Sequence, residues 1–288
     1  MTDQFGPYKA VAQIRMSLPS LTETEARLAQ VLTEYRNLEA GTPIKEIATE
    51  AGVSEALVVK VAKKMGFNGF SELKAAILGY RKGNSADLYS EISPDDKLET
   101  VASKVFRTSL QALEETLAIL DIEALDKTAQ TLLKARNVDI YGVGGSAQIG
   151  RDIAHKFLRI GRRFSLQDDS HMMLMSASVL GPEDVVIAIS HSGTTSAVIE
   201  AAEVAKKAGA TVIALSNYAR SPLAEIATIT LASTAQGGPL LGENAAARVA
   251  QLNIFDVVFV QVARLHGDLA IERLSLTQSA VTSKRKQS

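Results

Sequence analysis

The chain has 288 residues and a formal net charge of −1. This length allows one or two domains with a sizeable core, and the near-neutral charge excludes a wholly basic nucleic-acid-binding coat. The absence of cysteine excludes disulfides, thiolate metal sites and cysteine nucleophiles. We find no charged-then-apolar leader and no apolar run of membrane-spanning length, so we expect a cytoplasmic protein with no membrane partner.

The first 82 residues predict an all-helical domain. They carry 11 Lys and Arg against 9 Asp and Glu, a net of +2, and the remainder of the chain has a net of −3. This difference in net charge, although small, has the sign expected of a DNA-binding N-terminal domain. Thr22 and Glu25 have the Thr-x-x-Glu spacing of a capping box, which predicts a helix that begins at this point.

The next segment predicts a short helix over residues 44–51, a turn at Gly52 and a second helix with Ser54 as its N-cap. The pattern fits a helix-turn-helix, in which the second helix enters the major groove. It also fits an ordinary helical hairpin. Lysines at positions 60, 63 and 64 share a face, which suits phosphate contact but is equally typical of a solvated helix.

The rest of the chain alternates between helices and strands. We interpret residues 83–96 as a linker, 97–136 as two connecting helices and 268–288 as a C-terminal tail. Between them, over 137–267, the predicted strands are 138–141, 163–166, 185–189, 211–215 and 228–231. Strands that alternate with helices predict a parallel sheet with helices on both faces, a three-layer α/β/α domain.

Two loops of small residues follow predicted strands. Residues 190–195, Ser-His-Ser-Gly-Thr-Thr, lie between a buried strand and a helix that begins near Ala197. Free N–H groups at a helix start and hydroxyl donors suit a phosphate, so we predict a small phosphorylated ligand. The loop Gly142–Ser146 ends the first strand, and both loops lie at the carboxyl edge of the sheet, where they can meet over one ligand.

Neither loop matches a nucleotide-binding motif. The segment at 190–195 lacks the Gly-x-x-x-x-Gly-Lys pattern, and the third glycine of a dinucleotide fingerprint is absent at position 147. No spacing of histidines or carboxylates suggests a metal site. We therefore predict no cofactor and no metal.

The two halves of the chain resemble known domains. Residues 137–265 resemble a SIS (sugar isomerase) domain, and residues 43–70 resemble the RpiR-type helix-turn-helix. The motifs that carry the resemblance are Gly142-Val143-Gly144-Gly145-Ser146, Ala188-Ile189-Ser190-His191-Ser192-Gly193, Ala51-Gly52-Val53-Ser54-Glu55-Ala56 and Gly66-Phe67-Asn68-Gly69-Phe70. The order of the domains is that of the RpiR family of transcription regulators.

The resemblance implies a homodimer or homotetramer that binds the operator DNA of a sugar-catabolism operon. A pentose or hexose phosphate bound to the SIS domain would change the DNA affinity. The chain departs from many family members at Thr194 and from one sugar-operon regulator of the family at Glu243, so the resemblance does not assign the sugar. The candidate effector-binding residues are Gly145, Ser146, His171, Ser190, Ser192, Gly193, Thr194, Thr195 and Glu243.

The helix that begins after Ser54 is then the DNA-reading helix. The candidates for facing the groove are Glu55, Ala56, Leu57 and Val59, and the candidates for phosphate contact are Lys60 and Lys63.

A phosphosugar isomerase is the alternative, because the same domain occurs in enzymes. Catalysis would require a base beside C1 or C2 of the sugar, and Glu243, His171 and His191 are the obvious candidates, without a visible pairing. A third alternative is a sugar-phosphate-sensing adaptor that binds another protein. We predict a regulator rather than an enzyme.

Overall fold

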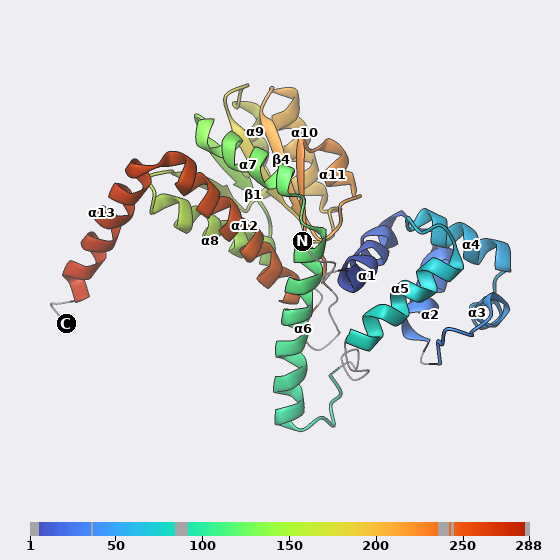
Figure 1. The fold of residues 1–288 in the computed structure, drawn as a ribbon. Coiled ribbons are helices and arrows are strands. Elements are labelled where there is room, and N and C mark those ends of the chain that lie inside the picture. Colours follow the sequence, from blue (N-terminus) through green and yellow to red (C-terminus); the bar gives the residue numbers. More distant parts are fainter. Residues whose placement is uncertain (1–5, 36, 84–91, 236–241, 243–244, 286–288) are drawn as a thin grey trace. The chain divides into compact units, whose positions relative to one another are not determined.

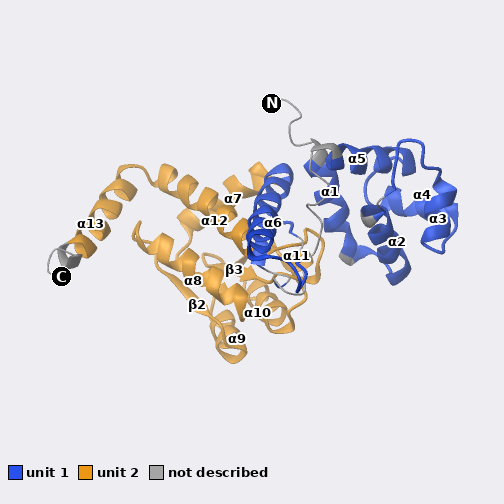
Figure 2. Ribbon diagram, turned by 90° about the horizontal axis from the view of Figure 1, so that it is seen from below, with its two compact units in different colours: residues 1–119, 234–247 blue, residues 120–233, 248–288 orange. Residues whose placement is uncertain are grey.

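The computed structural model describes residues 6–35, 37–83, 92–235, 242 and 245–285 (Figure 1). The chain divides into two compact units, which Figure 2 colours separately. Unit 1 comprises residues 1–119 and 234–247, and unit 2 comprises residues 120–233 and 248–288.

Unit 1 is helical, as predicted. Its elements are α1 (Gly6–Ser17), η1 (Leu18–Ser20), α2 (Glu23–Glu34), α3 (Ile44–Glu50), α4 (Glu55–Lys64), α5 (Phe70–Gly83) and α6 (Leu98–Ile119). Buried side chains of the first five α-helices share one apolar core, in which Leu28, Val61 and Leu73 are fully buried. The sequence predicts a helix that begins at the Thr22 capping box, the pair of helices around Gly52 and the first of the two helices within 97–136, which correspond to α2, α3, α4 and α6; α1 is not predicted.

The capping box at the start of α2 is confirmed and extends into an ion pair. The Thr22 N–H donates to Glu25 Oε2 over 2.9 Å, and the Glu25 N–H donates to Thr22 Oγ1 over 3.5 Å. The ammonium of Lys64, on α4, lies 2.7 Å from the same carboxylate. The hydrogen bonds from Lys64 and from the Thr22 N–H lower the pKa of Glu25 from 4.5 to about 2. One buried carboxylate therefore joins α2 to α4.

We expect Glu25→Gln to lower the free energy of unfolding of unit 1 by about 1–2 kcal/mol at pH 7, because it removes the ion pair with Lys64 and replaces the charged acceptor of the capping box with a neutral one. A carboxylate with a lowered pKa stabilises the fold above its unfolded pKa near 4.5 and loses this effect as the pH falls toward 2. The difference between wild type and variant should therefore shrink over this interval in urea unfolding. Glu23→Gln, at an exposed position in the same first turn, is the control; an equal loss of stability in this variant would contradict the role assigned to Glu25.

A buried polar cluster attaches α6 to the other helices of unit 1. Glu115 of α6 is fully buried and pairs with Arg15 of α1. Its Oε1 accepts hydrogen bonds from the Tyr80 hydroxyl of α5, over 2.6 Å, and from Gln111 Nε2, over 2.8 Å. Burial raises the pKa of Glu115, and Arg15 opposes this rise. A buried carboxylate is stable only with such partners, so α6 is fixed to α1 and α5.

Unit 2 is built on a five-stranded sheet. Its strands are β1 (Val138–Tyr141), β2 (Phe164–Gln167), β3 (Val185–Ile189), β4 (Thr211–Ser216) and β5 (Ile229–Ala232). Its helices are α7 (Ile122–Lys134), α8 (Gly145–Leu158), α9 (Ser170–Ser178), α10 (Ser196–Lys207), α11 (Pro222–Ile226), α12 (Ala245–His266) and α13 (Asp268–Arg285), and the division between units crosses α12. All strands are parallel, in the order β2-β1-β3-β4-β5.

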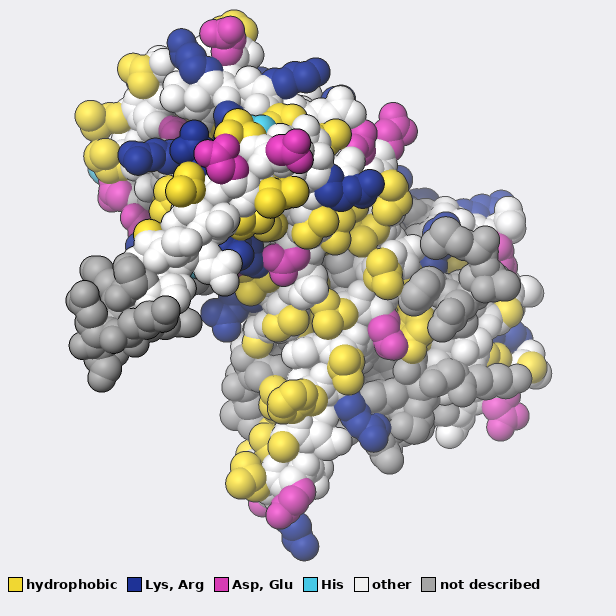
Figure 3. Space-filling model, turned by 60° about the vertical axis from the view of Figure 1, so that its left-hand side comes forward, with side chains coloured by type: hydrophobic (Ala, Val, Ile, Leu, Met, Phe, Trp, Pro, Cys, Tyr) yellow, Lys and Arg dark blue, Asp and Glu magenta, His cyan; other side chains and the backbone are white. Residues whose placement is uncertain are grey.

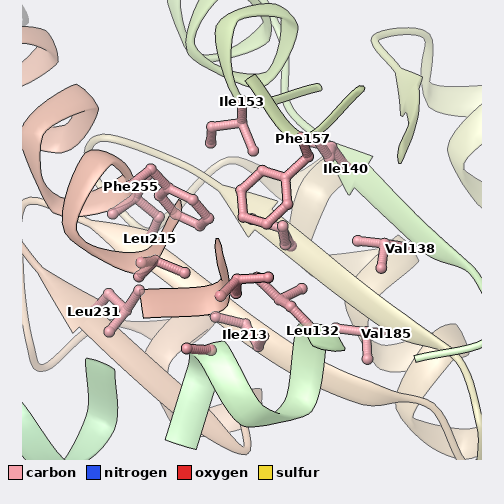
Figure 4. Close-up of a cluster of buried hydrophobic side chains, with 14 of the residues drawn as sticks. Leu132, Val138, Ile140, Ile153, Phe157, Val185, Ile213, Leu215, Leu231 and Phe255 are labelled. Carbon is pink, nitrogen blue, oxygen red and sulfur yellow. The ribbon is translucent and has the colours of Figure 1, made fainter. Parts of the chain in front are cut away.

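Two apolar cores cover the two faces of the sheet, which confirms the predicted three-layer α/β/α architecture. On one face, α7, α8 and α12 pack against alternate strand residues; Figure 4 shows Phe157 and Phe255, from two of these helices, in the same apolar cluster as Leu215 of β4. On the other face, α9, α10 and α11 pack against the intervening residues, such as Val186 and Ala214. The central strands β1, β3 and β4 are buried on both faces, which accounts for the continuous apolar sequence of β3, whereas the edge strands β2 and β5 are partly exposed.

The C-terminal region differs from the sequence prediction, since α13 occupies most of the segment that we had interpreted as a tail. Ala270 is buried, and the Thr277 hydroxyl lies 3.3 Å from the Arg159 carbonyl oxygen, so the helix packs beside the end of α8. Helices α12 and α13 also expose apolar side chains, among them Val260, Leu265 and Ile271, and Figure 3 shows hydrophobic side chains in several groups on the face of the molecule that it draws.

The prediction that no apolar run approaches membrane-spanning length is wrong for α12 by length and composition alone. This helix has 22 residues and a mean hydropathy of 1.3 over its most apolar window. Its Ile254, Phe255 and Val258 side chains are buried in the sheet core, as in a core helix of a globular domain.

Candidate functional site

The strand order brings the two predicted ligand loops side by side. β1 pairs with β2 on one side and with β3 on the other, so the direction of chain progression reverses between β1 and β3. In open parallel sheets, ligands bind at this switch point, outside the carboxyl ends of the strands. The loops 142–146 and 190–195 follow these two strands, which confirms that they share one edge of the sheet.

The first loop is a glycine turn that opens α8. Gly144 is the N-cap and has φ 55° and ψ −124°, a conformation that favours glycine. A side chain at Gly142 would lie 3.2 Å from the backbone of Ser146, so the loop closes tightly on the helix start. Ser146 is half-buried in the first turn, and its N–H donates to the Val143 carbonyl over 3.1 Å.

In the second loop, inner hydroxyls hold the backbone in shape. Ser190 is buried, and its Oγ shares a hydrogen bond of 2.9 Å with Thr195 Oγ1. The Gly193 N–H donates to Ser190 Oγ over 3.0 Å. Ser190 and Thr195 are thus engaged within the loop itself.

The outer part of the loop presents donors. Ser192 and Thr194 are exposed and share a hydrogen bond of 2.8 Å between their hydroxyls. Thr195 is the N-cap of α10, and its side chain makes no capping hydrogen bond. Because no side chain caps this helix start, its first N–H groups suit an anion. Neither loop contains lysine or arginine, so hydroxyls, N–H groups and helix dipoles supply the attraction for an anion.

The loop after β4 supports the second loop, and sequence analysis missed it. The Asn217 N–H and the Ser216 hydroxyl donate to the His191 carbonyl over 3.0 and 3.2 Å. Gly193 has φ 69°, and a Cβ there would lie 2.2 Å from Ser221 Oγ, so no side chain fits. The available signal was the polar pair Ser216-Asn217 directly after a buried strand. Arg220, exposed between β4 and α11, is a further cation near this edge of the sheet and is not among the predicted site residues.

Two predicted effector residues are not part of these two loops in the sequence. His171 is exposed in the first turn of α9, which Asp169 caps by accepting a 3.0 Å hydrogen bond from the Met172 N–H. Since α9 follows β2, His171 lies at the same sheet edge, but no hydrogen bond among the described residues joins it to either loop. Glu243 lies outside the described residues. Within the described ranges there is no cluster of three or more His, Asp or Glu side chains suited to a metal ion.

In unit 1, α3 and α4 are joined by a turn in which Gly52 has φ 63°, as the turn prediction required. Ser54 caps α4 by accepting a 3.3 Å hydrogen bond from the Leu57 N–H. The candidate DNA-contacting residues Ser54, Glu55, Ala56, Lys60 and Lys63 are exposed, whereas Leu57 and Val59 are half-buried.

The predicted lysine face is smaller than the sequence suggested. Lys64 pairs with Glu25, so it serves the contact between α4 and α2. Leu57 also packs against the core of unit 1. Lys60 and Lys63 remain as exposed cations on α4.

Comparison with known proteins assigns both halves. Residues 8–82 match the helix-turn-helix domain of the rpiR family, and residues 131–261 match the SIS domain. The chain is 40% identical to the HTH-type transcriptional regulator RpiR of Escherichia coli over 93% of its length and 90% of that protein. It is 34% identical to an uncharacterized HTH-type transcriptional regulator of Caldanaerobacter subterraneus, over 96% of this chain and 98% of the relative.

A solved structure shares the fold. The Vibrio vulnificus NanR protein, complexed with ManNAc-6P, aligns with a TM-score of 0.60 and 24% identity, over 95% of this chain and 98% of that one. Sequence and structure thus point to the same two-domain architecture.

Proposed function

The chain belongs to the RpiR family of helix-turn-helix transcriptional regulators with a SIS domain, and from this we propose that it binds operator DNA through α3 and α4 under the control of a sugar phosphate. The DNA-binding domain would lie within residues 1–82 and the effector domain within 137–267. The effector would favour one geometry of the regulator, because a ligand with equal affinity for both states shifts nothing.

The observation that carries this proposal is the pairing of β1 with β3, which places two loops of glycines and hydroxyls at one switch point. Ser192, Thr194 and the start of α10 would bind the phosphate, and Ser146 would bind the phosphate or a sugar hydroxyl. Ser190, Gly193 and Thr195 would hold the loop in shape. The ManNAc-6P in the NanR structure supports a phosphorylated sugar as the ligand class.

A paired experiment tests the proposal. Ribose 5-phosphate, fructose 6-phosphate and glucose 6-phosphate should be compared with ribose, fructose and glucose in thermal unfolding. A ligand at about 100 times its Kd adds about 2.7 kcal/mol to the stability, enough to raise the Tm by several degrees. The stabilising phosphate should also change the retardation of the protein's own upstream DNA. Upstream DNA that is not retarded, or retardation that no phosphate changes, would contradict the proposal.

We infer that the protein is not an enzyme. Isomerisation would need a base close to the sugar carbons. His191 is the one candidate base within the two loops; it is half-buried, its ring lies against Tyr218, and neither loop contains an acidic residue to pair with it. Incubation with ribose 5-phosphate should then yield no ketose phosphate. We further propose a cytoplasmic homodimer or homotetramer. The exposed apolar side chains of α12 and α13, among them Ile271, Leu276 and Val281, are consistent with self-association, which light scattering would measure.

A further inference from the structure

A buried hydrogen-bonded group lies at the carboxyl ends of β4 and β5. The Ser233 N–H donates to the Ser216 carbonyl over 2.9 Å. The Ser233 hydroxyl lies 3.2 Å from Asn217 Oδ1 and accepts a hydrogen bond of 3.1 Å from Gln251 Nε2. These four residues are at most 2% exposed. Buried polar groups with satisfied partners have defined positions, so this group is rigid.

The same group holds the proposed phosphate loop. Ser216 and Asn217 both donate to the carbonyl of His191, in the middle of that loop. The Gly193 carbonyl accepts a hydrogen bond of 3.1 Å from the Leu223 N–H, in α11. A rearrangement of residues 190–195 on ligand binding therefore acts directly on the ends of β4 and β5.

The residue after Ser233 belongs to unit 1. The Thr234 N–H donates to Thr116 Oγ1 over 3.1 Å, and the Thr116 hydroxyl lies 3.3 Å from the Thr234 carbonyl oxygen. Both threonines are buried. One hydroxyl on α6 thus satisfies both backbone polar groups of a single residue, which fixes the chain to α6 at the point where it leaves β5.

Helix α6 in turn is fixed to the DNA-binding helices. Glu115, adjacent to Thr116, pairs with Arg15 and accepts a hydrogen bond from Tyr80. These partners lie on α1 and α5, whose Ile14 and Ile77 are part of the same apolar core as α3 and α4. A displacement of Thr116 would therefore change the packing of α1 and α5 and, through the shared core, that of α3 and α4.

We propose that Thr116 is a positioning residue that transmits the state of the effector loop to the DNA-binding helices through the covalent step from Ser233 to Thr234. The inference rests on the proposed function, because it concerns how a sugar phosphate at residues 190–195 changes DNA affinity. Contiguous hydrogen bonds offer a route for coupling, and the coupling itself is a measurable free energy between two sites.

Thr116→Val tests this role, because valine keeps the shape and removes the hydroxyl. The effector Kd and the effector-free DNA Kd should stay within about threefold of wild type. The factor by which the effector changes DNA affinity, about 5- to 150-fold in typical allosteric proteins, should fall below about twofold. Thr116→Ser should restore it. The probe is whichever of ribose 5-phosphate, fructose 6-phosphate or glucose 6-phosphate stabilises the wild type. Thr128→Val, at another fully buried threonine, is the matched control.

Each outcome separates the possibilities. A Thr116→Val protein with a wild-type response overturns the inference alone, and so does one that loses effector or DNA binding, because Thr116 would then be merely structural. A wild type that does not respond to any of the three phosphates overturns the proposed function as well. Amide exchange in wild type offers a check without a variant: the probe should alter exchange at Thr234, and unaltered exchange contradicts the inference.

Discussion

Replacing Ser190 and Ser192 together with alanine is expected to abolish the response to sugar phosphate and to leave effector-free DNA binding intact. Ser192 is an exposed hydroxyl at the outer rim of the loop, and Ser190 holds the backbone of Gly193 from inside. A hydrogen bond to a charged group contributes about 1.5–3 kcal/mol, so losing the Ser192 donor alone weakens binding by roughly 10- to 150-fold. Thermal unfolding and DNA retardation with the phosphate panel measure the two effects separately.

The two single variants should differ. Ser190→Ala removes the hydrogen-bond partner of the Gly193 N–H and of the Thr195 hydroxyl. It should therefore lower the free energy of unfolding of unit 2 by about 1–2 kcal/mol and also weaken effector binding. Ser192→Ala should weaken effector binding without lowering the free energy of unfolding. Ser178→Ala, on the exposed last turn of α9, controls for a serine replacement elsewhere. A double variant that still responds, or one that loses DNA binding without effector, would refute the division of roles.

Most of the secondary structure could be predicted because its local determinants are strong. The strand over Val185–Ile189 is a short β-branched run, which suits a strand buried on both faces. Thr22 and Ser54 are helix N-caps whose side chains accept the expected hydrogen bonds. The alternation of such strands with helices was sufficient for the fold class.

What the sequence could not provide depends on residues far apart in the chain. The strand order β2-β1-β3-β4-β5 places the end of β4 beside the end of β3. For this reason Ser216 and Asn217 support the loop of His191; the local sequence shows only a polar pair at the end of a buried strand, which does not reveal this contact. Lys64 looked like a DNA contact because its partner, Glu25, is 39 positions away.

Helices α1 and α13 were missed for a related reason. Neither carries a clear capping signal, and α13 has no consistent apolar face in its sequence. Only a few of their residues are buried by tertiary packing, such as Ile14 of α1 and Ala270 of α13, and most of α13 is exposed. Helical stability in proteins comes mainly from such packing, which a periodicity argument cannot find when the packed face is short.

Lys60→Glu is expected to weaken operator binding by about 10- to 100-fold near physiological salt. The substitution removes one phosphate contact and adds a repulsive charge, so the slope of log K against log salt should become shallower by about 1. The helix itself should persist, since Ser54 still caps it and the new carboxylate lies four residues before Lys64, a favourable spacing. Fluorescence anisotropy with labelled upstream DNA at several salt concentrations measures both quantities.

The same variant should keep the full ligand-induced rise in Tm, because the effector loops lie in unit 2 and Lys60 lies in unit 1. Lys207→Glu, an equal charge change on the exposed end of α10, controls for the loss of overall positive charge and should leave DNA affinity within about threefold. If both variants weaken DNA binding equally, the effect is one of net charge and α4 is not the contact surface. If Lys60→Glu also abolishes the rise in Tm, DNA reading and effector binding are not separate functions of the two units.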